Sequence, residues 1–234
     1  MIMPTKIKTI IGATDEEIEN KKFNIFIPIS LGNKWFTKEK IKQYIFWALK
    51  HSKYDVIIII ADKLHQINLE VKDHYNSERA KRKAERISSK IEIEIKEIIE
   101  GFDKNEQEKI AILRWGDIDQ ERRYISIKKE VYSEFDKNKD FRKTILNIVK
   151  ENVRKLKNRE FSESEVLKLS EYVLNELPIF LYGVEYNRRL YNLHPYPVFT
   201  KICDLIDKIQ NGEFNDFYKR IGKPIGVIAE LDVI

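Results

Sequence analysis

The sequence predicts an α/β fold with a mostly parallel central sheet flanked by helices, and three observations support this prediction. An apolar run, Phe23 to Ile29, is followed by a helix-forming segment and a second apolar run, Asp55 to Ala61, in the order of a β-α-β unit. A third apolar run, Lys109 to Leu113, follows a long charged segment. Strands that alternate with helices in this way are typical of parallel sheets.

Helix signals separate these strands. Thr37 is expected to cap a helix with an apolar stripe, and Ser77 to Glu100 predicts a long charged helix. Thr14-Asp-Glu-Glu17 has the spacing of a capping box. The first strand is nevertheless expected at the apolar run that follows, so that it ends at Ser30.

The sequence of the C-terminal half predicts mainly helices. A helix-rich stretch is expected to run to about Arg159, and Ser162 to Glu165 forms a second capping box. The helix that starts there should end at Leu177, because Pro178 disfavours helical geometry in the residue before it. Beyond it we expect a loop over Tyr191 to Pro197, a helix from about Phe199 and a closing strand over Gly222 to Val233.

Composition limits the class of protein. A chain of 234 residues that is 42% hydrophobic can form one core, so residues 1–234 are expected to form a single domain. Cys203 is the single cysteine and no signal segment is evident, which predicts a cytoplasmic protein without disulfides. The apolar run Val56 to Ala61 is far shorter than the roughly 20 residues of a membrane helix, so no membrane span is expected.

Ser30 is the first candidate functional residue. It follows a predicted strand and precedes Leu31-Gly32-Asn33 and a helix, at the edge where open α/β sheets bind ligands. The alternative is that Gly32 and Asn33 only supply the backbone angles of a tight turn, with Ser30 capping an amide.

Tyr172 and Glu176 form the second candidate group. They stand four residues apart on a predicted helix, so their side chains share one face and can hold a ligand's ammonium group. A carboxylate in the last turn opposes the helix dipole, which favours a functional role for Glu176. The alternative is a solvated glutamate beside a half-buried tyrosine.

A basic stripe on the long charged helix is the third candidate. Its members suit contact with a phosphate backbone: Arg79, Lys81, Arg82, Lys83, Arg86 and Lys90. Because Glu78 and Glu85 interrupt the stripe, a solvated helix face is the alternative. The sequence has no glycine-rich nucleotide motif and no His/Cys grouping with zinc spacing, so neither a cofactor nor a metal is expected.

Taken together, the motifs resemble those of the cyclodipeptide synthases. The matching segments are Ile29-Ser-Leu-Gly-Asn33, Tyr172-Val-Leu-Asn-Glu176 followed by Leu-Pro-Ile-Phe-Leu181, and Tyr196-Pro197. The resemblance extends from about Lys22 to Val233. It implies a Rossmann-like fold similar to the catalytic domain of class I aminoacyl-tRNA synthetases, and Tyr196-Pro197 looks like the signature of the X-Tyr-Pro subfamily.

The resemblance also implies an activity and roles for single residues. Such enzymes make a cyclic dipeptide (2,5-diketopiperazine) from two aminoacyl-tRNAs by a ping-pong mechanism, through aminoacyl and dipeptidyl groups on a serine. The residues that match family positions are Ser30 as nucleophile, Tyr172 and Glu176 for the amino group, Tyr196 for proton transfer, Tyr124 as another active-site tyrosine and Asn33 as a subfamily marker. The expected partners are aminoacyl-tRNAs, and a monomer is expected.

Two positions qualify the match. Pro28 stands where the family usually has a small residue or glycine, and we expect Pro28 and residues near Ala61 to border a side-chain pocket. Tyr191 competes with Tyr196, which is followed by Pro197, for the assignment as the active-site tyrosine.

Two other functions remain open at this point. A serine hydrolase or acyltransferase would pair Ser30 with a histidine, for which His194 is the candidate. A non-catalytic RNA-binding module would rely on Arg79 to Lys90 and on Lys150 to Arg159.

Overall fold

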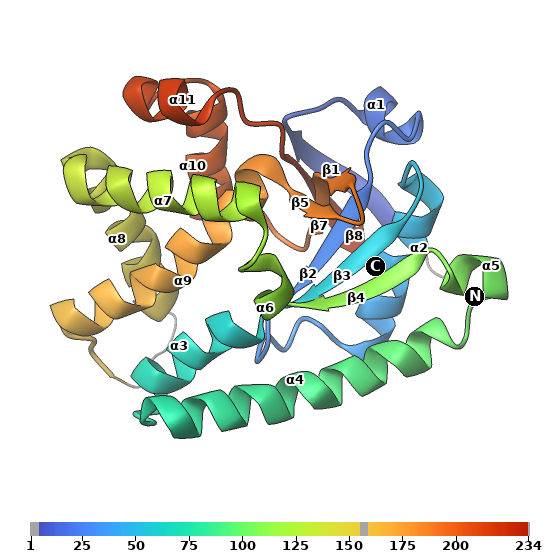
Figure 1. Ribbon diagram of the computed structural model, residues 1–234, viewed down its shortest axis with the longest axis horizontal. Helices are drawn as coiled ribbons and strands as arrows, with labels where there is room; N and C mark the ends of the chain where they lie inside the picture. Colours follow the sequence, from blue (N-terminus) through green and yellow to red (C-terminus); the bar gives the residue numbers. More distant parts are fainter. Residues whose placement is uncertain (1–4, 155–158, 234) are drawn as a thin grey trace.

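A six-stranded sheet forms the centre of the computed structural model, which describes residues 5–154 and 159–233 (Figure 1). The strand order is β1-β8-β7-β2-β3-β4, and every neighbouring pair is parallel except β1 with β8. The strands are β1 (Thr5–Ile11), β2 (Ile25–Ile29), β3 (Val56–Ile60), β4 (Ile110–Arg114), β7 (Leu193–Tyr196) and β8 (Val227–Val233). The predicted fold class, a mostly parallel sheet flanked by helices, is confirmed.

Helices cover both faces of this sheet (Figure 1). One face packs on α2 (Lys38–His51) and α4 (Ser77–Ile99). The other packs on α7 (Arg122–Lys137), α8 (Lys139–Arg154), α9 (Glu163–Tyr182) and α10 (Lys201–Gln210). The remaining elements are α1 (Asp15–Glu19), α3 (Asp62–Lys72), α5 (Lys104–Gln107), α6 (Trp115–Ile118), α11 (Asn215–Ile221) and the hairpin β5 (Val184–Tyr186) with β6 (Arg189–Tyr191). Among the described residues, no helix is both long and apolar enough to cross a membrane.

One edge of the sheet collects the carboxyl ends of the parallel strands. Ile29 pairs with Ile60 at the ends of β2 and β3, and the Ala61 backbone N–H donates to the Ile29 carbonyl at 3.1 Å. Because β7 runs parallel to β2, its end lies at the same edge. The edge therefore brings Ser30, which follows β2, to the same side of the sheet as Tyr196, which ends β7.

The N-terminal part of the chain differs from the prediction. An additional strand, β1, precedes the strand that ends before Ser30, which is therefore the second strand and not the first. Ile11 is the one buried residue of this edge strand, and a register shift between Ile7 and Thr9 interrupts its two-residue alternation, which made the strand hard to recognise from its sequence. The capping box at Thr14 and Glu17 does form, and it starts the short helix α1.

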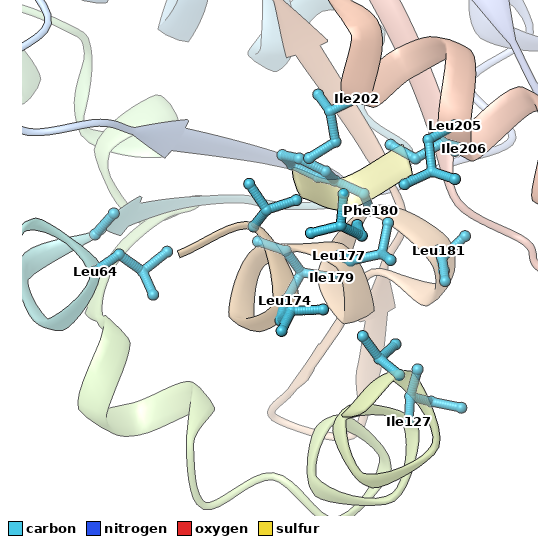
Figure 2. Packing of buried hydrophobic residues seen from close by; sticks show 14 of the residues in the cluster. Leu64, Ile127, Leu174, Leu177, Ile179, Phe180, Leu181, Ile202, Leu205 and Ile206 are labelled. Atoms are coloured by element: carbon cyan, nitrogen blue, oxygen red, sulfur yellow. The ribbon is translucent and has the colours of Figure 1, made fainter. Parts of the chain in front are cut away.

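Helix α9 continues through Pro178 to Tyr182, so the prediction that it ends at Leu177 is wrong. A proline inside a helix costs about 3 kcal/mol. The last turns are nevertheless fully buried against α10 and α7, as Figure 2 shows for Leu177, Ile179 and Phe180. Each such side chain contributes about 1.5–3 kcal/mol, so burial outweighs the missing hydrogen bond. The helix ends at Gly183, whose φ is +76°.

The segment from Tyr191 to Pro197 is not a loop, which is a second correction. It contains the end of β6 and all of β7, and β7 lies between β8 and β2 in the sheet. Pro195 argued against a central strand, because proline cannot donate to a ladder. The pairing of β7 with β2 is at Leu193, opposite Ile25, so Pro195 lies beyond that contact.

Candidate active site

Ser30 lies in a tight turn between β2 and α2. Gly32 has a φ of +78°, and a Cβ at this position would lie 3.0 Å from His65 Cε1. Asn33 accepts a hydrogen bond from the Trp35 backbone N–H through Oδ1 at 3.0 Å. Gly32 and Asn33 thus do shape the turn, as the structural alternative expected. That role leaves the hydroxyl of Ser30 available for another contact.

The Ser30 hydroxyl meets Tyr172 of α9. Ser30 Oγ and Tyr172 Oη lie 3.2 Å apart, and either oxygen can donate. Burial and, secondarily, the nearby Glu176 carboxyl raise the Tyr172 pKa, while the Ser30 hydrogen bond lowers it. Tyr172 is therefore a neutral phenol at ordinary pH, able to donate one hydrogen bond and to accept others.

Glu176 lies one turn further along α9 and is 8% exposed, so the alternative of a solvated glutamate is wrong. Burial raises the pKa of its carboxyl to about 8. Because α9 extends to Tyr182, Glu176 is not in the last turn, and the helix-dipole argument does not apply. The carboxyl is protonated at neutral pH until a positively charged group enters.

Tyr196 joins this group from the end of β7. Burial raises the pKa of the Tyr196 hydroxyl well above its usual value. The nearby side chains of Glu176 and Tyr172 raise this pKa further. Tyr191 lies elsewhere: its hydroxyl is 3.5 Å from Oδ2 of Asp55, the residue before β3. Tyr196, and not Tyr191, therefore lies within electrostatic reach of Glu176.

His194 is not placed to act as a base for Ser30. It is fully buried, its ring stacks on Phe180 at 4.6 Å, and it lies 5.0 Å from the ring of Phe26. Burial lowers its pKa to about 3, so the ring is neutral. Within residues 5–154 and 159–233, neither ring nitrogen has a hydrogen-bond partner. The pair that the hydrolase interpretation requires is not formed.

Tyr124 and Pro28 are buried in elements that carry or contact the site residues. Tyr124 in α7 is buried, and its hydroxyl donates to the carbonyl of Asn175, the residue before Glu176, at 3.0 Å. Pro28 is buried in β2 opposite Ile59. Pro197 directly follows Tyr196 and is partly exposed.

A cleft of about 570 Å³ opens beside Ser30 and Tyr172. Apolar side chains from α8 and α9 form part of its wall, and its polar lining includes Asn33, Asn68, Lys72 and Asn152. Sequence reasoning missed the last three. The spacing of Asn68 and Lys72, four residues apart on one helix that begins at the functional edge, was the available signal.

The basic stripe does not form one continuous surface. Four members line one groove together with Tyr75, namely Arg79, Arg82, Lys83 and Arg86. Lys81 faces a different depression, which Asp62 and Glu70 also line, and Lys90 lies 3.9 Å from Glu94.

The structure describes the second basic segment, Lys150 to Arg159, only in part. Of the second basic segment, Lys150 and Arg154 lie near the end of α8, whereas residues 155–158 are outside the described residues. No cluster of three or more His, Cys, Asp or Glu side chains suited to a metal ion occurs in the part of the chain that is described.

Comparison with known proteins decides the family. The family model described as cyclodipeptide synthase matches residues 10–211. The chain belongs to the cyclodipeptide synthase family. Members of this family are enzymes of aminoacyl transfer, so the chain is an enzyme of that class. A search of curated protein sequences finds no match.

Solved structures agree with this assignment. A cyclodipeptide synthase from Bacillus thermoamylovorans is 25% identical, with 94% of this chain and 92% of that chain covered and a TM-score of 0.76. A synthase from Candidatus Glomeribacter gigasporarum bound to Phe-tRNAPhe is 17% identical, with 90% and 86% covered and a TM-score of 0.55. Tyrosyl-tRNA synthetase from Archaeoglobus fulgidus is 12% identical, with 96% and 60% covered and a TM-score of 0.56. The fold is thus shared with a class I synthetase.

Proposed function

We propose that this synthase takes two aminoacyl-tRNAs and joins their amino acids into a cyclic dipeptide, with Ser30 as the nucleophile of a ping-pong mechanism. The observation that carries the proposal is the 3.2 Å contact of Ser30 with Tyr172, one turn from the buried Glu176. The bound Phe-tRNA of a structural relative supports aminoacyl-tRNA as the substrate class. Tyr196-Pro197 supports membership of the X-Tyr-Pro subfamily.

In the first step, Ser30 Oγ attacks the ester carbonyl of the first aminoacyl-tRNA. A new ester bond forms to Ser30, the bond to the ribose oxygen breaks, and the serine proton goes to that oxygen as the tRNA leaves. The exchange of one ester for another needs no ATP. Because serine is a weak nucleophile, the hydrogen bond with Tyr172 serves to orient its hydroxyl.

Glu176 binds the amino group of the first amino acid. An α-ammonium group that enters the site favours the carboxylate, so Glu176 ionises as the substrate binds. The phenol oxygen of Tyr172 accepts a second hydrogen bond from the same ammonium. A buried ion pair formed only with substrate present makes the site selective for a free α-amino group.

In the second step, the amine of the serine-bound amino acid attacks the ester carbonyl of the second aminoacyl-tRNA. A peptide bond forms and the bond from the carbonyl carbon to the ribose oxygen breaks. That oxygen takes up the second proton that the attacking nitrogen loses, and the second tRNA leaves with a dipeptidyl group remaining on Ser30. The amine must lose its proton before it attacks, and Glu176, whose carboxyl pKa burial raises to about 8, is the proposed acceptor.

In the last step, the free amine of the dipeptidyl group attacks the Ser30 ester carbonyl. The six-membered ring closes, the bond between the ester carbonyl carbon and Ser30 Oγ breaks, and Oγ takes up a proton. Tyr196, grouped with Glu176 and Tyr172, is the proposed carrier of that proton.

The test is expression of the chain in a bacterial host, with mass spectrometry of the medium for every two-residue diketopiperazine. We expect a new dipeptide mass with the wild type and its loss with Ser30→Ala. A soluble wild-type protein that yields no such mass would refute the proposed function.

A further inference from the structure

The cleft beside Ser30 has a polar side that the proposed chemistry does not use. Lys72 ends α3, Asn68 lies one turn before it, and both line the same cleft as Ser30. Residues four apart on a helix share a face, so the amide and the ammonium point in the same direction. Together they suit a ligand that is negatively charged and accepts hydrogen bonds.

Lys72 has no ion-pair partner in the part of the chain that the structure describes. The residue stays accessible to solvent, while its surroundings desolvate the ammonium and lower its pKa, an effect that Asp73 partly opposes. A partly desolvated ammonium without a paired carboxylate favours an anion from solution.

His65 connects this cleft to the basic groove on α4. The ring packs beneath Gly32 in the turn after β2. Burial lowers the pKa of His65, and the positive charges of Lys72 and Lys83 lower it further. Lys83 lines the basic groove and Lys72 lines the cleft, so His65 is within electrostatic reach of a cation from each.

Tyr75 lies in the connection between α3 and α4, where the end of one helix meets the start of the other (Figure 1). The guanidinium of Arg79 lies 4.1 Å from the centre of its ring, and the ammonium of Lys83 lies 4.9 Å from it. An aromatic ring among cations is typical of surfaces that bind single-stranded nucleic acid, because bases stack and phosphates pair with the charges.

We propose that Lys72, with Asn68, binds the last phosphodiester of the single-stranded 3′ end of tRNA, and that this end leaves the cleft past Tyr75 toward α4. The inference rests on the proposed function, because the reacting ester is at the 3′ terminus. That phosphodiester is one nucleotide from the ester, so its partner must share the cleft with Ser30. Lys72 meets this condition, whereas the arginines of α4 line the separate groove.

The test compares Lys72→Ala and Lys72→Arg with the wild type, and with Lys219→Ala as a control. Lys219 lies on α11, and its side chain is 67% exposed. Binding is measured at several salt concentrations with uncharged tRNA and with the same tRNA lacking its single-stranded 3′ nucleotides. For intact tRNA, Lys72→Ala should bind roughly tenfold more weakly at low salt. Its log–log salt slope should be smaller by about 0.7, the value for one single-strand phosphate contact.

Lys72→Arg and Lys219→Ala should bind like the wild type, and all four proteins should bind the shortened tRNA equally. Lys72→Ala that binds intact tRNA as well as the wild type overturns the inference. An equal loss for intact and shortened tRNA also overturns it, because the lysine would then contact another part of the tRNA. Failure of the proposed function would look different, since the wild type would then form no cyclic dipeptide, whatever its affinity for tRNA.

Discussion

Replacing Glu176 by Gln should remove a pH dependence of stability that burial of this carboxyl creates. In the folded protein its pKa is raised from 4.5 to about 8. Each pKa unit is worth about 1.4 kcal/mol, so keeping the ionised group buried costs about 5 kcal/mol. Gln keeps the shape of the side chain but carries no charge at any pH.

The direction follows from proton binding. Between pH 4.5 and 8 the folded protein holds a proton on Glu176 that the unfolded chain has already released. The free energy of unfolding of the wild type therefore falls as the pH rises through this window. Glu176→Gln should be close to the wild type near pH 4.5 and more stable by several kcal/mol at pH 9.

The assay is urea unfolding of both proteins, without substrate, at half-unit steps from pH 4.5 to 9. Other groups titrate in the same range, so the quantity to follow is the difference between variant and wild type at each pH. Glu171→Gln is the matched control on the same helix, because Glu171 is more exposed and its carboxylate pairs with Lys168 at 2.7 Å. A difference between Glu176→Gln and wild type that stays constant with pH would show that burial of the Glu176 carboxyl does not cause a pH dependence of stability.

Four further predictions concern other parts of the molecule. Tyr172→Phe removes the 3.2 Å contact with Ser30 and should slow product formation by at least about tenfold without changing tRNA affinity, as steady-state kinetics would show. A positive φ at a residue other than glycine costs roughly 1–2 kcal/mol. Gly32→Ala should lower the free energy of unfolding in urea by more than this, because the new Cβ meets His65. Gly212→Ala, where φ is +81° and no atom lies near the new Cβ, should cost only that amount. His194→Leu should unfold at higher urea than the wild type, and increasingly so below pH 6.5, because the buried ring must take up a proton on unfolding. Arg79→Ala should reduce the salt slope of tRNA binding by about one unit, measured by titration at several salt concentrations, and an unchanged slope would remove this residue from the interface.

The parts of the fold that follow local rules were predictable. The apolar runs of β2 and β3 and the caps of α2, α4 and α9 are each set by a few neighbouring residues. Where distant packing decides, prediction failed. Helix α9 passes Pro178 because its last turns are buried against other helices, and β7 is a strand because the sheet pairs with it on both sides.

The site shows the same division. The motifs predicted Ser30, Tyr172, Glu176 and Tyr196 as candidates, and the structure brings Ser30 to Tyr172, and Tyr196 within electrostatic reach of Glu176. The protonation of Glu176 depends on burial, which no local pattern reveals. The spacing of Asn68 and Lys72 indicates a shared helix face, but their proximity to Ser30 arises only when α3 folds beside the turn after β2.

The most direct test of the central claim is the mass of the intact protein after incubation with a single kind of aminoacyl-tRNA. We expect that the wild type gains the mass of one aminoacyl group, that peptide mapping locates it on Ser30, and that Ser30→Ala gains nothing. Equal labelling of wild type and Ser30→Ala, or cyclic product formed by Ser30→Ala at the wild-type rate, would contradict it.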